Sequence, residues 1–83
     1  MLTGFNNNIV YKNDVYHVQT ENGGVKNPVI STLVYRKGAI VASKKMSYAD
    51  ILHEEKFEET VRQLMENQHR NMIKALLGGE LGI

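Results

Sequence analysis

The sequence predicts an α+β domain in which a four-stranded antiparallel meander packs against a long C-terminal amphipathic helix (ββββα). In the first half of the 83-residue chain, two pairs of apolar segments each flank a short turn signal. In the second half, apolar residues recur at helical spacing. One domain is expected at this length. Its predicted parts are an N-terminal segment (1–8), a sheet (9–46), a helical region (47–78) and a frayed tail (79–83).

The first predicted hairpin turns at Asn13-Asp14, a pair that tolerates the positive φ of a tight turn. A two-residue turn at this point pairs Tyr11 with Tyr16. The side chains of this hairpin that should face the helix are Ile9, Tyr11, Tyr16 and Val18.

The second predicted hairpin turns at Lys37-Gly38, where glycine supplies the positive φ. The same register pairs Tyr35 with Ile40. The side chains expected to face the helix are Val29, Leu33, Tyr35, Ile40, Ala42 and Met46. The side chains expected on the far face, with Val34 opposite Val41, are Ile30, Val34 and Val41.

A helix is predicted from about Glu54 to Leu77. Ser47 and Asp50 have the spacing of a capping box just before it. The residues that recur at helical spacing and form its mainly apolar stripe are Phe57, Val61, Leu64, Gln68 and Met72, with Met65 and Leu76 beside them. Leu64 lies in the middle of the stripe, so we expect it to be buried between helix and sheet.

The predicted helix is longer than the predicted strands. A helix of roughly 24 residues spans about 36 Å, whereas a strand of seven or eight residues spans about 25 Å. The helix should therefore extend past the sheet and leave apolar side chains without cover. These residues are Met72, Ile73, Leu76 and Leu77. They predict self-association as a homodimer, and the alternative is that residues 1–8 fold back over them.

The far face of the sheet is a second candidate interaction surface, because a single helix cannot cover both faces. Ile30, Val34 and Val41 are its expected apolar residues. The alternative is an ordinary solvent-facing side, which antiparallel sheets commonly have.

The charges are divided along the chain. Residues 22–49 carry five cations and no acid, whereas residues 50–66 carry six acids and two cations. The two regions could simply attract each other or be solvated. The more specific interpretation is an anionic-ligand site on the second hairpin, formed by Arg36, Lys37, Lys44 and Lys45.

No pattern in the sequence indicates catalysis, a cofactor or a metal. The chain has no cysteine, and its three histidines lack the i,i+4 spacing of a helical metal site. The serines have no nucleophile-elbow context. We expect a non-enzymatic protein that binds neither cofactor nor metal.

The sequence also lacks signals for secretion or membrane insertion. Its first eight residues have neither a basic region nor an apolar run. No apolar stretch approaches the ~20 residues of a membrane span. We expect a cytoplasmic protein that makes no contact with a membrane.

Ser43-Lys44-Lys45, placed after three strands and before a helix, resembles the back half of a double-stranded-RNA-binding domain, in which a lysine pair contacts phosphates. The chain departs from that family in two ways. Residues 5–20 are predicted as strands where the family has its first helix, and the last helix is rich in glutamate, which repels phosphate. Nucleic-acid binding is therefore only the alternative to a protein partner.

Four segments resemble a family of short bacterial proteins that has no assigned activity. They are Tyr16-His17-Val18-Gln19-Thr20-Glu21, Asn27-Pro28-Val29-Ile30, Ala42-Ser43-Lys44-Lys45 and Ser47-Tyr48-Ala49-Asp50. The resemblance implies a bacterial source and says nothing about chemistry. The sequence thus favours a small protein-interaction or scaffold module whose protein partner it does not identify.

Overall fold

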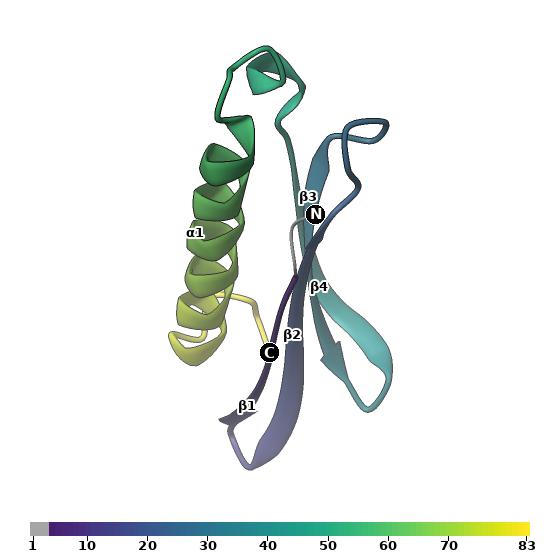
Figure 1. Cartoon of the computed structure of the whole chain (residues 1–83). Helices are drawn as coiled ribbons and strands as arrows, with labels where there is room; N and C mark the ends of the chain where they lie inside the picture. Colours follow the sequence, from purple (N-terminus) through teal and green to yellow (C-terminus); the bar gives the residue numbers. More distant parts are fainter. Residues whose placement is uncertain (1–3) are drawn as a thin grey trace.

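The computed structural model describes residues 4–83 and confirms the predicted α+β class, with one antiparallel sheet and one C-terminal α-helix (Figure 1). The strands lie side by side in sequence order, β1-β2-β3-β4. The elements are β1 (Phe5–Tyr11), β2 (Asp14–Asn22), β3 (Val29–Arg36), β4 (Ala39–Ser47), a 3-10 turn (Ala49–Ile51) and α1 (Phe57–Leu77). The helix runs along one face of the sheet (Figure 1).

The N-terminal segment predicted for residues 1–8 supplies most of a strand instead. β1 begins at Phe5, which pairs with Thr20 of β2. Residues 1–3 lie outside the described part of the chain, and so does their share of the predicted fold-back over the helix.

The first hairpin turns one residue earlier than predicted. Lys12 and Asn13 occupy the turn with φ of 50° and 65°. Tyr11 then pairs with Asp14, whose carboxylate lies 2.5 Å from the Arg36 guanidinium. The register differs from the predicted one by two residues, and an even shift leaves each side chain on its face. The predicted helix-facing residues of this hairpin therefore do pack against the core: Ile9, Tyr11, Tyr16 and Val18.

The second hairpin turns at Lys37-Gly38 as predicted, with φ of 52° and 81°. Glycine adopts this left-handed backbone without steric cost, and two consecutive positive φ values match the twist of the flanking strands. Tyr35 pairs with Ile40, also as predicted.

A β-bulge then displaces the rest of β4 from the predicted register. Val34 pairs with Ala42 and not with Val41, which is the extra residue in β4. Because of this extra residue, each side chain of β4 beyond Val41 points to the opposite face from the one that an unbroken pairing with β3 would give it. Ala42 therefore packs against the core as predicted, and Val41 stays exposed.

The predicted faces of β3 are wrong. Ile30 and Val34, expected on the far face, are fully buried beneath the helix. Their orientation is set by β2, because Val34 lies opposite Val18 of the core face. β3 has apolar residues on both faces, so its own pattern does not distinguish them. The residues wrongly expected to face the helix are Val29, Leu33, Tyr35 and Ile40.

The core consists of two apolar clusters beneath the helix. The distal cluster, near the C-terminal end of α1, contains Tyr16, Val18, Val34, Met72 and Leu76. The proximal cluster, near its N-terminal end, contains Ile30, Tyr48, Val61 and Met65. Between them lies a buried polar layer of Thr20, Thr32, Gln68 and His69.

The helix does not extend past the sheet. α1 has 21 residues, which span about 31 Å, and β2 has nine, which span about 30 Å. The prediction began the helix three residues too early and made the strands too short. As a result Met72 and Leu76 are buried within the protein itself, against β2 and β3.

The C-terminal tail is packed rather than frayed. Gly79 has φ of 73°, its N–H donates to Leu76 O, and the Glu80 N–H donates to Ala75 O at 2.9 Å. This is the Schellman arrangement that reverses a chain after a helix. Leu81 and Ile83 then pack against the distal cluster, and Figure 1 shows the tail turning back toward the sheet.

The positions of Leu64 and Met65 correct the predicted helix face and give a test of it. Met65 is fully buried, whereas Leu64 is only half-buried. We expect Met65→Ala to lower the free energy of unfolding by about 2–5 kcal/mol, the usual cost of truncating a buried Met to Ala. Leu64→Ala should cost clearly less. Denaturant unfolding of both variants checks the order, and equal losses would contradict it.

Candidate functional site

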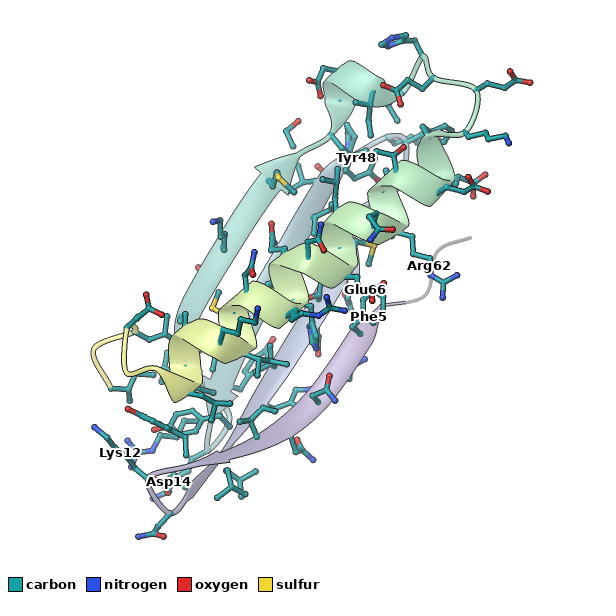
Figure 2. The ribbon with its side chains drawn as sticks, turned by 90° about the vertical axis from the view of Figure 1, so that its left-hand side faces the viewer. Phe5, Lys12, Asp14, Tyr48, Arg62 and Glu66 are labelled. Atoms are coloured by element: carbon teal, nitrogen blue, oxygen red, sulfur yellow. The ribbon has the colours of Figure 1, made fainter. Side chains whose placement is uncertain are left out.

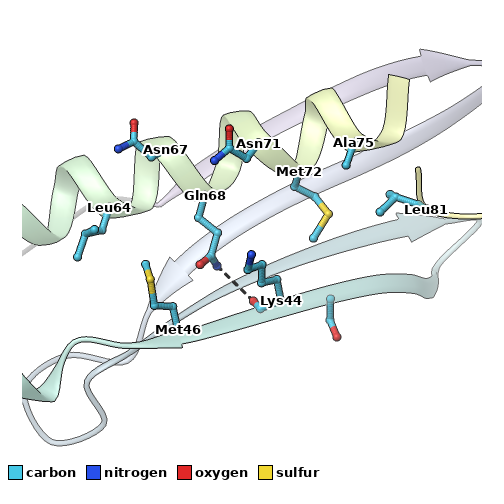
Figure 3. A pocket seen from close by; sticks show the side chains of 10 residues that line it. Lys44, Met46, Leu64, Asn67, Gln68, Asn71, Met72, Ala75 and Leu81 are labelled. Carbon is cyan, nitrogen blue, oxygen red and sulfur yellow. Dashed lines mark hydrogen bonds between the residues drawn. The ribbon is translucent and has the colours of Figure 1, made fainter. Parts of the chain in front are cut away.

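The helix leaves one strand of the sheet largely uncovered. α1 packs against β1, β2 and β3, and it crosses the sheet obliquely with β4 emerging at its side (Figure 2). A groove of about 460 Å³ runs between α1 and β4 (Figure 3). Its lining residues are Ser43, Lys44, Met46, Leu64, Asn67, Gln68, Asn71, Met72, Ala75 and Leu81. We call this the α1–β4 groove.

The chemistry of the groove changes along its length. Figure 3 shows Met46 beneath Leu64 at one end, and Met72, Ala75 and Leu81 gathered at the other. Between these apolar ends lie Lys44 and Gln68, whereas Asn67 and Asn71 line the outer rim with their amides directed away from the sheet. The groove is therefore apolar at both ends and polar in the middle.

β4 is also an edge strand, because the sheet order places it beside β3 alone. Its two lysines point to opposite faces. Lys44 lies opposite the buried Thr32 and belongs to the groove, whereas Lys45 lies opposite Ser31 on the far face. Within residues 4–83 neither lysine forms an ion pair.

Gln68 connects the helix to β3 and β4. Its Nε2 donates to Thr32 Oγ1 at 3.0 Å and to Lys44 O at 3.2 Å. Its Oε1 is buried and has no hydrogen-bond partner among the described residues. An unpaired buried acceptor is costly, at about 1–3 kcal/mol.

His69, the next residue of the helix, forms its hydrogen bonds with the other two strands, β1 and β2. Its Nε2 lies 2.7 Å from Asn7 Oδ1, and its Nδ1 lies 2.7 Å from Thr20 Oγ1. Since an amide oxygen only accepts, Nε2 carries the proton and Nδ1 accepts from Thr20. Thr32 Oγ1 then donates to Thr20 Oγ1 at 2.7 Å. The bonds thus form one directed chain that ends on a neutral imidazole.

This series of hydrogen bonds opposes protonation of His69. With a proton on Nδ1, Thr20 could no longer donate to the imidazole, and one of the two threonine hydroxyl hydrogens would be left without an acceptor. Burial, and to a lesser extent the charge of His17, lowers the pKa of His69 below its ordinary value of 6.5. The two threonine hydroxyls are fully buried, so the chain joins helix to sheet and offers no nucleophile to solvent.

The other two histidines form no hydrogen bond with this layer. His17 lies on the far face, with Asn8 Oδ1 2.9 Å from Nδ1 and Asn6 Oδ1 3.2 Å from Nε2. His53 is exposed between the 3-10 turn and α1. Across residues 4–83, no three His, Cys, Asp or Glu side chains gather as a metal site would require.

The structure disperses the two apolar surfaces expected from the sequence. On the distal helix, Met72 and Leu76 are buried and Ile73 is half-buried, which leaves Leu77 exposed. On the far face of the sheet, Ile30 and Val34 are absent because they belong to the core. The exposed apolar residues that do lie there or at its rim are Val10, Val15, Ile40 and Val41.

The four cations predicted to form one anionic-ligand site do not share a surface. Arg36 is paired with Asp14 and stacks on Tyr16, at 5.9 Å from the ring centre. Lys37 lies in the turn. Lys44 and Lys45 face opposite sides of β4. The structure brings only Lys44 into the groove.

The groove amides were missed from the sequence, although signals for them were present. Asn67 and Asn71 are spaced i,i+4 and so share one side of the helix. Gln68 interrupts the apolar stripe, and a polar residue in such a stripe needs partners.

The chain matches no protein-family model, no curated protein and no solved structure. No helix within residues 4–83 is long and apolar enough to cross a membrane.

The lowered pKa of His69 predicts a loss of stability in mild acid. The unfolded chain binds a proton at this residue near pH 6.5, whereas the folded chain resists it. The free energy of unfolding should therefore be constant above about pH 6.5 and fall as the pH drops below that value. Urea unfolding across this range measures the effect.

His69→Gln should flatten this dependence, since glutamine can both donate to Asn7 and accept from Thr20 without titrating. His53→Gln is the matched control and should leave the dependence unchanged. If wild type and His69→Gln lose stability in parallel on acidification, another group is responsible.

Proposed function

We propose that this domain is a non-enzymatic protein-interaction module that binds an extended segment of a partner protein along β4. The observation that supports this most directly is the α1–β4 groove, which lies beside one of the two edges of the sheet. An extended segment added to such an edge gains affinity from main-chain hydrogen bonds and specificity from alternate side chains.

The geometry of the sheet suits this mode of binding. Strands in a sheet lie about 4.8 Å apart, and a helix with its side chains is about 10–12 Å wide. A helix centred over β1, β2 and β3 therefore leaves space beside it for a further strand next to β4. Every second side chain of that strand would point into the groove.

The edge favours a partner other than a second copy of this chain. An antiparallel pairing of two β4 strands centred on Lys44 and Lys45 would oppose like charges, which destabilises paired strands. The distal helix, predicted to drive a homodimer, has Met72 and Leu76 buried. Self-association through that surface is therefore not part of this proposal.

Nucleic-acid binding, the alternative from the sequence, has little support from the arrangement of cations. A phosphate backbone is bound by several cations on one surface. Here Arg36 is already paired with Asp14, and Lys44 and Lys45 face opposite sides of the sheet.

The proposal predicts that random peptides displayed on phage and selected on the immobilised domain will bind at β4. Amide chemical shifts of the domain should then move chiefly in β4 and along the groove-lining side of α1. Asn71→Trp places a large side chain in the groove at an exposed helix position. It should weaken the selected peptides by about tenfold or more, which corresponds to ~1.4 kcal/mol.

Arg62→Trp is the matched control, since Arg62 is exposed on the same helix and points away from β4 (Figure 2). It should leave peptide binding unchanged. The proposal fails if selection yields no binder, or if the selected peptides perturb the far face of the sheet and ignore Asn71→Trp.

A further inference from the structure

The chemistry of the α1–β4 groove specifies the partner segment, if the proposed strand addition is correct. We infer that the segment carries two consecutive acidic residues. The first points into the groove and is flanked, two residues away on each side, by apolar residues. The second points to the far face of the sheet.

The spacing follows from the strand that receives the segment. Beyond the bulge, Ala42, Lys44 and Met46 lie on the helix side of β4, opposite the buried Val34, Thr32 and Ile30 respectively. In paired strands, directly opposite residues point to the same face. A fifth strand would therefore direct every second side chain into the groove, opposite Ala42, Lys44 and Met46 in turn.

The central position should be acidic. Lys44 lies in the polar middle of the groove and forms no ion pair within residues 4–83. Asn67 and Asn71 line the outer rim of the same stretch, with their amides directed away from the sheet (Figure 3). A carboxylate there would meet the Lys44 ammonium, and charge-assisted hydrogen bonds of this kind are the strong ones.

The two flanking positions should be apolar. One faces the end of the groove formed by Met46 and Leu64, and the other faces Met72, Ala75 and Leu81. The groove volume of about 460 Å³ lies within the range of about 300–1,000 Å³ typical of small-molecule pockets, which are lined mainly by apolar side chains. It can therefore receive a side chain at each end.

The second acid follows from the alternation of the strand. Lys45 is adjacent to Lys44 in sequence and points to the opposite face, so its cross-strand neighbour is the residue next to the central acid. Exposed lysines on an edge strand discourage unwanted pairing. Two consecutive acidic residues in the partner would pair with these two lysines, so the edge would accept this segment and still discourage others.

The test is the sequence content of selected peptides. A phage-displayed library of random peptides is selected in parallel on wild type, on Lys44→Glu/Lys45→Glu and on Arg62→Glu. Both lysines and Arg62 are exposed, so these variants should fold, and their amide spectra verify it. Wild type and Arg62→Glu should enrich acidic pairs with apolar residues at the stated spacing. The double variant should enrich basic pairs and bind the wild-type peptides at least about tenfold more weakly.

The outcomes separate this inference from the proposed function. If peptides bind at β4 without an acidic preference, or if the double variant keeps the wild-type preference, the inference fails while strand addition stands. If no peptide binds at β4, the proposed function itself fails. If apolar residues are enriched but not at the stated spacing, the groove does not fix the alignment of the segment along β4, and the inference is again wrong.

Discussion

A single helix holds all four strands of this sheet through two adjacent polar side chains. His69 bonds to Asn7 of β1 and Thr20 of β2, and Gln68 bonds to Thr32 of β3 and to the backbone of β4 at Lys44. Both residues lie in the middle of α1, between the two apolar clusters. Hydrogen bonds weaken steeply when their distance or angle departs from the preferred value. This polar layer therefore fixes where the helix lies on the sheet.

That placement also determines what the helix leaves open. Its buried face rests on β1, β2 and β3, and β4 is joined to it by the Gln68 hydrogen bond and by the packing of Ala42 and Met46. The amide of Gln68 is used on its donor side only, since Oε1 has no partner among the described residues. A small domain with one helix and four strands thus has an open groove and a free strand edge at the same place. The proposed interaction site follows from this shortage of covering structure rather than from any catalytic arrangement.

Local patterns predicted the elements of the fold, and longer-range contacts decided how they face one another. The turn at Lys37-Gly38 could be predicted because glycine is favoured where φ must be positive. The faces of β3 could not, because Val29–Arg36 is apolar on both sides and its orientation depends on pairing with β2. The bulge at Val41 has no glycine or other turn residue to mark it.

The candidate site was only partly predictable. Lys44 was singled out by its charge, but its separation from Arg36 and Lys45 depends on register and pairing. The comparison of helix length with strand length gave the wrong result because the predicted boundaries of the helix and of the strands were wrong. An error of three helical residues and one or two strand residues produced an apolar surface that the protein in fact buries at Met72 and Leu76.

Amide hydrogen exchange of the free protein tests the central claim, that α1 covers three strands and leaves β4 open at its edge. Backbone groups of covered central strands exchange only through large openings, whereas those at an open edge exchange readily. The account predicts the slowest exchange in β2 and β3, and fast exchange at those β4 amides that do not bond to β3. Protection throughout β4 equal to that of β2 would mean that the edge is already occupied, and it would contradict the account.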